Sequence, residues 1–342
     1  MATRRALLVP AAALLLAGCA ITSGSSAPPP PDAMGRPALD PLITLSVVAC
    51  EPLLWCIAAG TNPTSSTSSG ASVEISAGGH AGWAKVVAPP LDDATLTAAS
   101  CWGSGCLLGG SDATGSLLEI VNPKKRVASI ESATLPGLGV AALSCPAAGR
   151  CLALVTTSVD TAVFKSTTSG STWQLLTTLP AALSTATSLS CATPRACVAV
   201  GTGPTGAEAA RTSDGGQKWS LAARPKGLQV FSAASCGPSW CMATARLRNG
   251  RTELLQSRNR GASWARYVTS IERPGAVTCA TATTCVAAGG GPGGGAIASY
   301  VRPDHQRVLT VEYVPDPLIA IACASATRCA GITLASTVSI EL

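Results

Sequence analysis

The chain contains few charged and few aromatic residues. Only 12% of its 342 residues are Asp, Glu, Lys or Arg, and 4% are aromatic, against roughly 25% charged residues in an ordinary soluble protein. This scarcity excludes an acidic or basic disordered tail, a coiled coil and a typical nucleic-acid-binding protein. No apolar run reaches the about 18 residues that a membrane-spanning helix needs. The two His and three Tyr leave few groups for a catalytic or metal site.

The beginning of the chain has the pattern of an export signal. Arg4 and Arg5 precede an apolar stretch at 6–16, which is too short to span a membrane and ends in small residues. The Leu-Ala-Gly-Cys sequence at 16–19 resembles the lipobox of bacterial lipoproteins. That resemblance implies cleavage before Cys19, a lipid on its sulfur, and retention at the outer face of the cytoplasmic membrane. The alternative is an ordinary secretory signal with an incidental cysteine.

Composition predicts three parts of the chain. Residues 1–18 are the expected lipoprotein signal peptide. Residues 19–40 are rich in Ser and Pro and show no periodicity, so we expect a lipidated, semi-extended tether of about 3.1 Å per residue where it is polyproline-like. Residues 41–342 form the expected folded domain, and the 47% hydrophobic content of the whole chain provides ample material for a core.

The fifteen cysteines divide into one single residue and seven pairs. Cys19 is the single one, and the members of each pair are five or six positions apart. The first members follow one another at intervals of 43 to 51 residues, which indicates a repeat array. The pairs are Cys50/Cys56, Cys101/Cys106, Cys145/Cys151, Cys191/Cys197, Cys236/Cys241, Cys279/Cys285 and Cys323/Cys329.

Each cysteine pair is expected to close a β-hairpin. The Gly103-Ser104 sequence suits a two-residue turn, and residues 147–149 suit a three-residue turn with Gly149 in the left-handed conformation. Both turn lengths would place the two cysteines opposite each other, at about the distance that a disulfide requires. Each disulfide would add about 2 kcal/mol of stability by the chain-entropy estimate.

Zinc is the competing explanation for paired cysteines. It normally takes cysteines two to four positions apart, with two pairs, or a pair and two His, converging on one ion. Here seven separate pairs occur with almost no His, in a chain bound for an oxidising compartment. We therefore predict seven disulfides, and neither a metal site nor a cofactor.

A second motif recurs later in the repeat. Segments 166–173, 212–219 and 257–264 share a hydroxyl at position 1, a small polar residue at 3, Gly at 5, a hydroxyl or Lys at 7 and Trp at 8. The pattern resembles the Asp-box, or bacterial neuraminidase repeat, of sialidase-like β-propellers, although only Asp214 preserves the acid. It predicts a hairpin turn with hydrogen-bonded polar side chains, a glycine at positive φ and a tryptophan between blades. Segment 76–83 keeps only the spacing, and segments 122–125 and 303–306 replace the motif.

These repeats predict an all-β fold. Four strands in about 45 residues, repeated seven times, are typical of a seven-bladed β-propeller of four-stranded antiparallel blades, with one disulfide per blade. A β-solenoid is disfavoured because its coils are usually shorter. The last unit ends after its third strand, and residues 33–40 could supply the fourth. We expect a loop at the glycine-rich segment 289–295, between the second and third strands of unit six. Disulfides and Asp-box turns should share one face of the disk.

The resemblance to sialidases does not assign a catalytic residue. That family needs three arginines, a Tyr nucleophile with a Glu neighbour, and an Asp acid, on the face opposite the Asp-boxes. Here the first arginine after the tether is Arg126, and Tyr300 and Tyr313 fall within predicted strands. We therefore expect a non-catalytic binding or assembly scaffold, as in Asp-box propellers that assist photosystem assembly. A sialidase-like glycan-processing hydrolase remains the alternative.

One charge asymmetry points to a binding surface. Residues 211–273 contain eleven basic and three acidic residues, whereas the rest of the exported chain is mildly acidic. This sector is either an uncommitted solvated surface or a site for an anionic partner, such as a protein, an acidic glycan, a wall polymer or a lipid headgroup. We expect a monomer that binds no nucleic acid. Six cations should gather on the face opposite the disulfides: Arg224, Lys226, Arg246, Arg248, Arg251 and Arg273.

Overall fold

The computed structural model describes residues 44–51, 55–62, 70–77, 82–86, 94–125, 127–129, 135–291, 293–301, 305–307, 316–333 and 337–341. The chain divides into two units, Met1–Ala38 and Leu39–Leu342, and every described residue belongs to the second. Cys19, the predicted tether and the segment at 33–40 that could complete the last unit lie outside the described residues.

The described residues form strands arranged in seven sheets. Sheet one contains β1 (Thr44–Glu51), β2 (Trp55–Asn62), β3 (Gly70–Ala77) and β4 (Ala84–Lys85), and sheet two contains β5 (Thr95–Trp102), β6 (Gly105–Asp112), β7 (Gly115–Asn122) and β8 (Val127–Ser129). Sheet three contains β9 (Gly139–Ala147), β10 (Arg150–Thr156), β11 (Thr161–Ser166) and β12 (Gln174–Thr178). Sheet four contains β13 (Thr185–Cys191), β14 (Cys197–Gly203), β15 (Gly206–Thr212) and β16 (Ser220–Leu221). Sheet five contains β17 (Leu228–Cys236), β18 (Cys241–Leu247), β19 (Thr252–Ser257) and β20 (Ala265–Tyr267). Sheet six contains β21 (Arg273–Cys279), β22 (Thr284–Gly291), β23 (Gly294–Val301) and β24 (His305–Arg307), and sheet seven contains β25 (Ala320–Cys323), β26 (Arg328–Ile332) and β27 (Thr337–Glu341).

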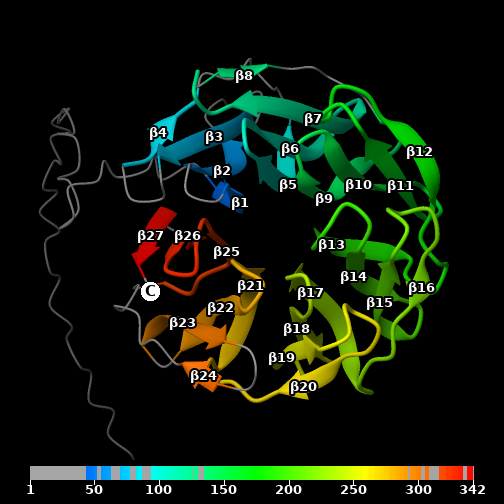
Figure 1. Ribbon diagram of the computed structural model, residues 1–342, viewed down its shortest axis with the longest axis vertical. Helices are drawn as coiled ribbons and strands as arrows, with labels where there is room; N and C mark the ends of the chain where they lie inside the picture. Colours follow the sequence, from blue (N-terminus) through cyan, green and yellow to red (C-terminus); the bar gives the residue numbers. More distant parts are fainter. Residues whose placement is uncertain are drawn as a thin grey trace, which may run out of the picture. The chain divides into compact units, whose positions relative to one another are not determined.

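The sheets lie around a common centre, with the first strand of each innermost (Figure 1). Within every sheet the strands are antiparallel and follow one another in chain order. The first strand of each sheet lies beside the first strand of the next, and β1 lies beside both β5 and β25. The all-β prediction is confirmed, and the last sheet has three strands among the residues described, as the sequence predicts. No helix in the described part of the chain could cross a membrane.

Apolar clusters fill the spaces between neighbouring sheets. In the cluster between sheets three and four, Leu154 and Val163 pack with Leu189 and Ala199. The first and last sheets meet in the same way, through a cluster that includes Leu45 of β1. Each second strand therefore has neighbours on both of its faces, which explains why these strands are almost continuous runs of Ala, Val, Leu and Gly.

All seven predicted disulfides are present. Their Cα–Cα distances are 3.8–4.1 Å, and in six sheets the two cysteines are direct partners in the strand register. The exception is Cys145–Cys151, where the predicted three-residue turn is wrong. Ala147 pairs with Arg150 around a two-residue turn, and the extra residue is absorbed as a register shift before Leu152. Gly149 has φ +68°, as predicted.

The second cysteine of each disulfide is also a core residue, a burial that the sequence did not predict. These cysteines begin or follow the start of the second strand, which has an apolar cluster on each side, so their sulfur atoms are enclosed between sheets. They therefore stabilise the fold and cannot contact a partner. The pairing itself does not reveal this burial, because a hairpin disulfide can equally lie in solvent. All seven are 0–2% exposed: Cys56, Cys106, Cys151, Cys197, Cys241, Cys285 and Cys329.

A glycine four residues after the second cysteine lets the first strand pass close to the second. A Cβ atom on Gly201 would lie 2.0 Å from the carbonyl oxygen of Thr185. The first strand changes register beside this position, between Ala186 and Ser188, and only a residue without a side chain fits beneath it. The equivalent glycines face the same obstruction, at 1.8–2.0 Å: Gly60, Gly110 and Gly289.

The predicted loop at 289–295 is largely strand. Gly289 pairs with Ala296, Gly290 with Gly295 and Gly291 with Gly294, so strand pairing extends through most of this segment. Glycine has no side chain that could show the alternation of a strand, which is why the sequence suggested a loop. The close approach of β21 to Gly289 gives the glycines a structural reason.

A ladder of hydrogen bonds joins sheets two to six near the disulfides. The hydroxyl of the serine before the first cysteine accepts a hydrogen bond from the N–H of the equivalent cysteine in the next sheet, at 2.8–3.0 Å. The recurring Ser-Cys sequence is thus a contact between repeats. The pairs are Ser100 with Cys145, Ser144 with Cys191, Ser190 with Cys236 and Ser235 with Cys279.

Candidate functional site

The turns of the sheets lie on two opposite faces. The first-to-second and third-to-fourth turns share a face, since the N–H of Gly149 donates to Ser169 Oγ at 2.9 Å. On the other face, a Cβ on Gly115 in a second-to-third turn would meet the carbonyl oxygen of Gly137, which leads into the next sheet, at 2.8 Å. We call the first the disulfide face and the second the loop face.

The three Asp-box-like segments form the predicted hairpin turns on the disulfide face. In sheet four, Thr212 Oγ1 accepts a hydrogen bond from Gly216 N at 3.1 Å, and Asp214 Oδ1 accepts from Gln217 N and Lys218 N at 3.0 Å. These bonds, above all that from Lys218, hold the pKa of Asp214 below its usual value.

Other polar residues replace the aspartate in the two remaining turns. Thr168 Oγ1 accepts from Thr172 N at 2.8 Å, and Asn259 Oδ1 accepts from Ser263 N at 2.9 Å. A single side-chain oxygen at the third position is therefore enough to hold the turn, and this explains why two of the three segments lack the acid.

The glycine and the tryptophan of these turns also have their predicted roles. Gly170, Gly216 and Gly261 have φ of +96°, +94° and +80°. The indole N–H of Trp219 donates to the carbonyl oxygen of Gly216 at 3.1 Å, while the ring packs between sheets three and four. The substitute turn at 122–125 is a hairpin turn as predicted. Parts of segments 76–83 and 303–306 lie outside the described residues.

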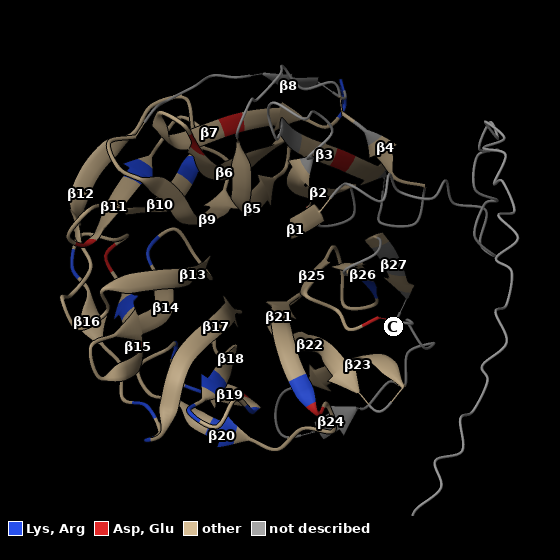
Figure 2. Cartoon of the chain, turned by 180° about the vertical axis from the view of Figure 1, so that it is seen from behind, with Lys and Arg blue, Asp and Glu red and all other residues tan. Residues whose placement is uncertain are grey.

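Five of the six predicted cations are exposed on the loop face. Lys226 lies between β16 and β17, Arg246 near the end of β18, and Arg248 and Arg251 in the turn that follows. Arg273 begins β21. None of the five has an ion-pair partner among the described residues. In Figure 2, basic residues gather around β18–β20 and the neighbouring loops.

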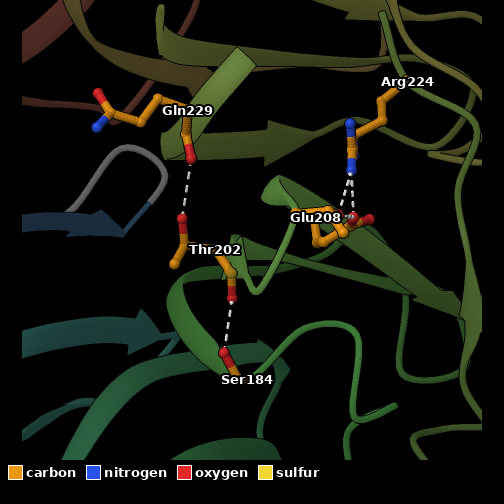
Figure 3. A network of polar contacts seen from close by, with 6 residues as sticks. Ser184, Thr202, Glu208, Arg224 and Gln229 are labelled. Carbon is orange, nitrogen blue, oxygen red and sulfur yellow. Dashed lines mark hydrogen bonds and ion pairs between the residues drawn. The ribbon is translucent and has the colours of Figure 1, made fainter. Parts of the chain in front are cut away.

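The sixth cation, Arg224, is engaged in an ion pair. Its guanidinium contacts the carboxylate of Glu208, which is buried on β15 (Figure 3). It also donates to Thr205 Oγ1 at 3.2 Å. Sequence reasoning missed this pair because Glu208 precedes the basic segment. Arg224 thus contributes less free charge to the loop face than the sequence suggests.

The loop that carries Lys226 is fixed by its neighbours. Arg266 donates to the carbonyl oxygen of Lys226 at 2.9 Å and pairs with Glu253 at 2.7 Å. Thr202, near the end of β14, donates to the carbonyl oxygen of Gln229 in β17 at 3.0 Å (Figure 3). The cations therefore project from an ordered frame, which lowers the entropic cost of binding a partner.

Arg273 lies flat against a glycine. A Cβ atom on Gly290 would be 3.0 Å from its Nε and 3.2 Å from its Nη2. The absence of a side chain there gives the guanidinium its place beside β22. This contact could not be inferred from sequence, because Arg273 and Gly290 are joined only by strand pairing.

A central hollow of about 660 Å³ opens among the innermost strands of all seven sheets. Small residues dominate its wall, and the first cysteine of every disulfide lies on it. Glu51 is the single charged residue along the described wall, and burial raises the pKa of its carboxyl. No metal-binding cluster of His, Cys, Asp and Glu occurs among the residues that the structure describes.

Tyr300, one of the tyrosines expected within a strand, is a core residue. It is fully buried, its hydroxyl lies 2.5 Å from Thr269 Oγ1, and its ring meets Tyr267 edge-on at 5.2 Å. Burial raises its pKa to about 12. It is therefore placed to stabilise sheet six. Tyr313 and Arg126 lie outside the described residues.

Comparison with known proteins identifies the fold. No protein-family model matches the chain, and no curated protein matches its sequence. Among solved structures it is similar to YCF48 bound to D1 peptide, with 14% identity, a TM-score of 0.63, and coverage of 89% of this chain and 95% of that one. The chain has a β-propeller fold.

Two further β-propeller structures are also similar to the chain. YCF48 from Cyanidioschyzon merolae gives 14% identity and a TM-score of 0.58 over 89% of this chain and 97% of that one. The WD40 repeats of RRP9 give 10% identity and a TM-score of 0.66 over 88% and 94%. At such low identities the likeness concerns the fold alone.

Proposed function

We propose that this β-propeller is a non-catalytic extracytoplasmic scaffold, anchored by a lipid on Cys19, whose loop face binds an acidic segment of a protein partner. The observation that carries the proposal is the group of exposed cations Lys226, Arg246, Arg248, Arg251 and Arg273, none of which has an ion-pair partner in the described structure. Exposed like charges of this kind attract an anionic partner and accelerate its association.

The architecture proposed for this scaffold is a closed propeller of seven blades, with Asp-box turns. The contacts of β1 with β5 and β25 support closure. The hydrogen bonds within the turns at 166–173, 212–219 and 257–264 support the kinship with Asp-box repeats. A disk of this kind is a rigid platform that needs no moving part to hold a partner.

A protein partner is favoured over an acidic polymer for one reason. One similar structure is YCF48 bound to D1 peptide, so a propeller of this shape accommodates a peptide. We assign no peptide sequence from that structure to the present chain, and derive only the expected negative charge from its own residues.

Binding of a fluorescein-labelled decaglutamate peptide to the full mature chain tests this proposal. Replacing Arg246, Arg248 and Arg251 by Ser should weaken binding at least tenfold at low salt, at about 0.5–1 kcal/mol per lost contact. The affinity of the unaltered protein should also fall as salt rises.

The matched control is Arg258→Ser with Arg260→Ser on the disulfide face. These positions correspond to Ser213 in the turn of sheet four and Ser169 in that of sheet three, and Ser169 has the same φ of +57° as Arg260. Equal loss in both variants, or no loss in the first, would reject the loop-face site. Tighter binding of polygalacturonate than of the peptide would identify an acidic polymer as the partner instead.

A further inference from the structure

β12 is the longest fourth strand in the described structure. It has five residues, whereas β4, β8, β16, β20 and β24 have two or three each. It pairs with β11 on one side only and lies at the outer rim of sheet three (Figure 1). Its other edge therefore offers backbone N–H and C=O groups to an added strand.

This edge has little of the usual protection against pairing. The sequence of β12, QLLTT, contains neither a charged residue nor proline, the two side-chain devices that most often block an edge strand. Leu175 is 56% exposed. A register shift opposite Val163 and Phe164 is the one interruption of its pairing with β11.

A hollow of about 670 Å³ lies at the disulfide-face end of this edge. Three consecutive residues of β12 line it, together with the turns of sheets three and four. Its wall contains two cations and no acid. Its lining includes Lys165, Trp173, Gln174, Leu175, Gln217 and Lys218.

Lys165 is the central charge of this hollow. It lies on β11, opposite Leu152 and Gln174, and is half-buried. Its Nζ is 3.8 Å from where a Cβ on Gly215 would lie, so it points toward the turn of sheet four. No hydrogen bond or ion pair satisfies it within the described structure.

The acid nearest in sequence to Lys218 is held by hydrogen bonds within its own turn. Asp214 belongs to the turn that also carries Lys218, and its Oδ1 is held by the N–H groups of Gln217 and Lys218 at 3.0 Å. It does not line the hollow. A half-buried lysine without a partner in the described structure, beside an unpaired strand edge, therefore favours an anionic ligand from outside the chain.

We propose that the β12 edge and this hollow form a second binding site, which takes an extended acidic peptide. The peptide would add a strand to sheet three, place a carboxylate between Lys165 and Lys218, and pack an apolar side chain against Leu175. Main-chain hydrogen bonds would provide affinity and the two lysines selectivity. An acidic peptide fits better than an acidic sugar, because only a peptide can pair its backbone with the strand edge. This site is independent of the loop face.

A phage-displayed library of random heptapeptides, selected on the full mature chain, supplies the probe. Enriched peptides should carry Asp or Glu among β-branched residues. Binding of a selected peptide should weaken about fivefold to tenfold in the double variant Lys165→Gln and Lys218→Ser. These replacements are matched to the chain itself, because Gln256 and Ser263 occupy the equivalent positions in sheet five.

Two controls separate loss of this site from loss of the loop face and from loss of the fold. The loop-face variant Arg246→Ser, Arg248→Ser and Arg251→Ser should bind the selected peptide as tightly as the unaltered protein does. The thermal unfolding midpoint of the lysine variant should equal that of the unaltered protein, so that an unfolded chain is not mistaken for an altered site.

Backbone N-methylation of the peptide tests the strand-addition mode. Methyl groups should abolish binding at alternate positions only, because successive N–H groups of a strand point to opposite sides. The proposal fails if binding is indifferent to N-methylation, if it survives loss of both lysines, or if the selected peptides contain no acid. Binding of oligogalacturonate at these lysines, without any peptide, would overturn it in favour of a sugar site.

Discussion

Ser144 Oγ, in the innermost strand of sheet three, accepts a hydrogen bond from the N–H of Cys191, in the innermost strand of sheet four, at 3.0 Å. The two residues are 47 positions apart, yet the contact recurs at nearly the same spacing in three other pairs of sheets. One serine hydroxyl thus joins the innermost strands of two neighbouring sheets, close to their disulfides.

Replacing Ser144 by Ala should destabilise the fold by about 1 kcal/mol. The change leaves the Cys191 N–H without its acceptor in a partly buried position. Ser158→Ala, on an exposed turn of the loop face, is the control and should leave stability unchanged. Guanidinium unfolding without reductant measures both, and equal midpoints for the two variants would contradict the role given to Ser144.

Gly201→Ala should cost about 1–3 kcal/mol, the usual range for overpacking. Its new Cβ would lie 2.0 Å from the carbonyl oxygen of Thr185, so the first strand of sheet four would have to move. Gly103→Ala, in an open turn with no atom within 4 Å of the new Cβ, provides the comparison. Thermal unfolding should separate the two variants, and similar midpoints would mean that β13 shifts freely.

Glu119 should make stability depend on pH. The side chain is fully buried on β7, neither carboxylate oxygen has a hydrogen-bond partner among the described residues, and burial raises its pKa from 4.5 to about 7. The folded state therefore keeps a proton that the unfolded state releases. This contribution to stability is complete below pH 4.5 and is lost as pH rises toward 7.

The corresponding experiment compares the unaltered protein with Glu119→Gln. Between pH 5 and pH 8, the unaltered protein should lose about 2–3 kcal/mol more stability than the variant, since one pKa unit corresponds to about 1.4 kcal/mol. If the free energy of unfolding changed with pH in the same way for both proteins, Glu119 would have the same pKa in the folded and unfolded states, and the prediction would be wrong.

Cys19→Ser should release the protein from the membrane. The lipid on this cysteine is the anchor that the sequence predicts, so removal of the sulfur should remove the attachment. Fractionation of cells after a high-salt wash measures the effect, and the wash removes molecules held by charge alone. Retention of the variant in the membrane fraction would reject the lipoprotein assignment.

Sequence predicted the features that depend on neighbours along the chain. The spacing of Cys191 and Cys197 is enough to predict a hairpin and its disulfide, and the pattern around Asp214 is enough to predict a tight turn. The hairpin and the turn are each formed by residues only a few positions apart, so a short stretch of sequence contains all the groups that determine them. The number and order of the strands follow from the repetition of the unit that contains one cysteine pair.

The features that sequence missed involve partners far apart in the chain. Glu208 reaches Arg224 across a sheet, and Arg273 lies against Gly290 only because their strands pair. The hollow beside Lys165 exists because the turn of the next sheet, at Gln217 and Lys218, closes over it. No local sequence pattern predicts these long-range contacts, because each of them joins residues from different segments of the chain.

The serine–cysteine hydrogen bonds join only some of the neighbouring sheets, so the contacts between sheets should differ in stability. Each rung runs from the serine of one sheet to the cysteine of the next. Ala49 takes the place of that serine in sheet one, where Ser46 Oγ donates instead to the carbonyl oxygen of Leu96 in sheet two at 2.6 Å. Ala322 takes its place in sheet seven, and because a methyl group accepts no hydrogen bond, there is no serine rung from sheet seven to sheet one. These two sheets therefore meet through side-chain packing around Leu45 and Ile332. Local opening should begin at this seam. Backbone amides of β1 and β25 should exchange with deuterium before those of β13, because the contact between the first and last sheets opens more readily than the contacts that the serines join.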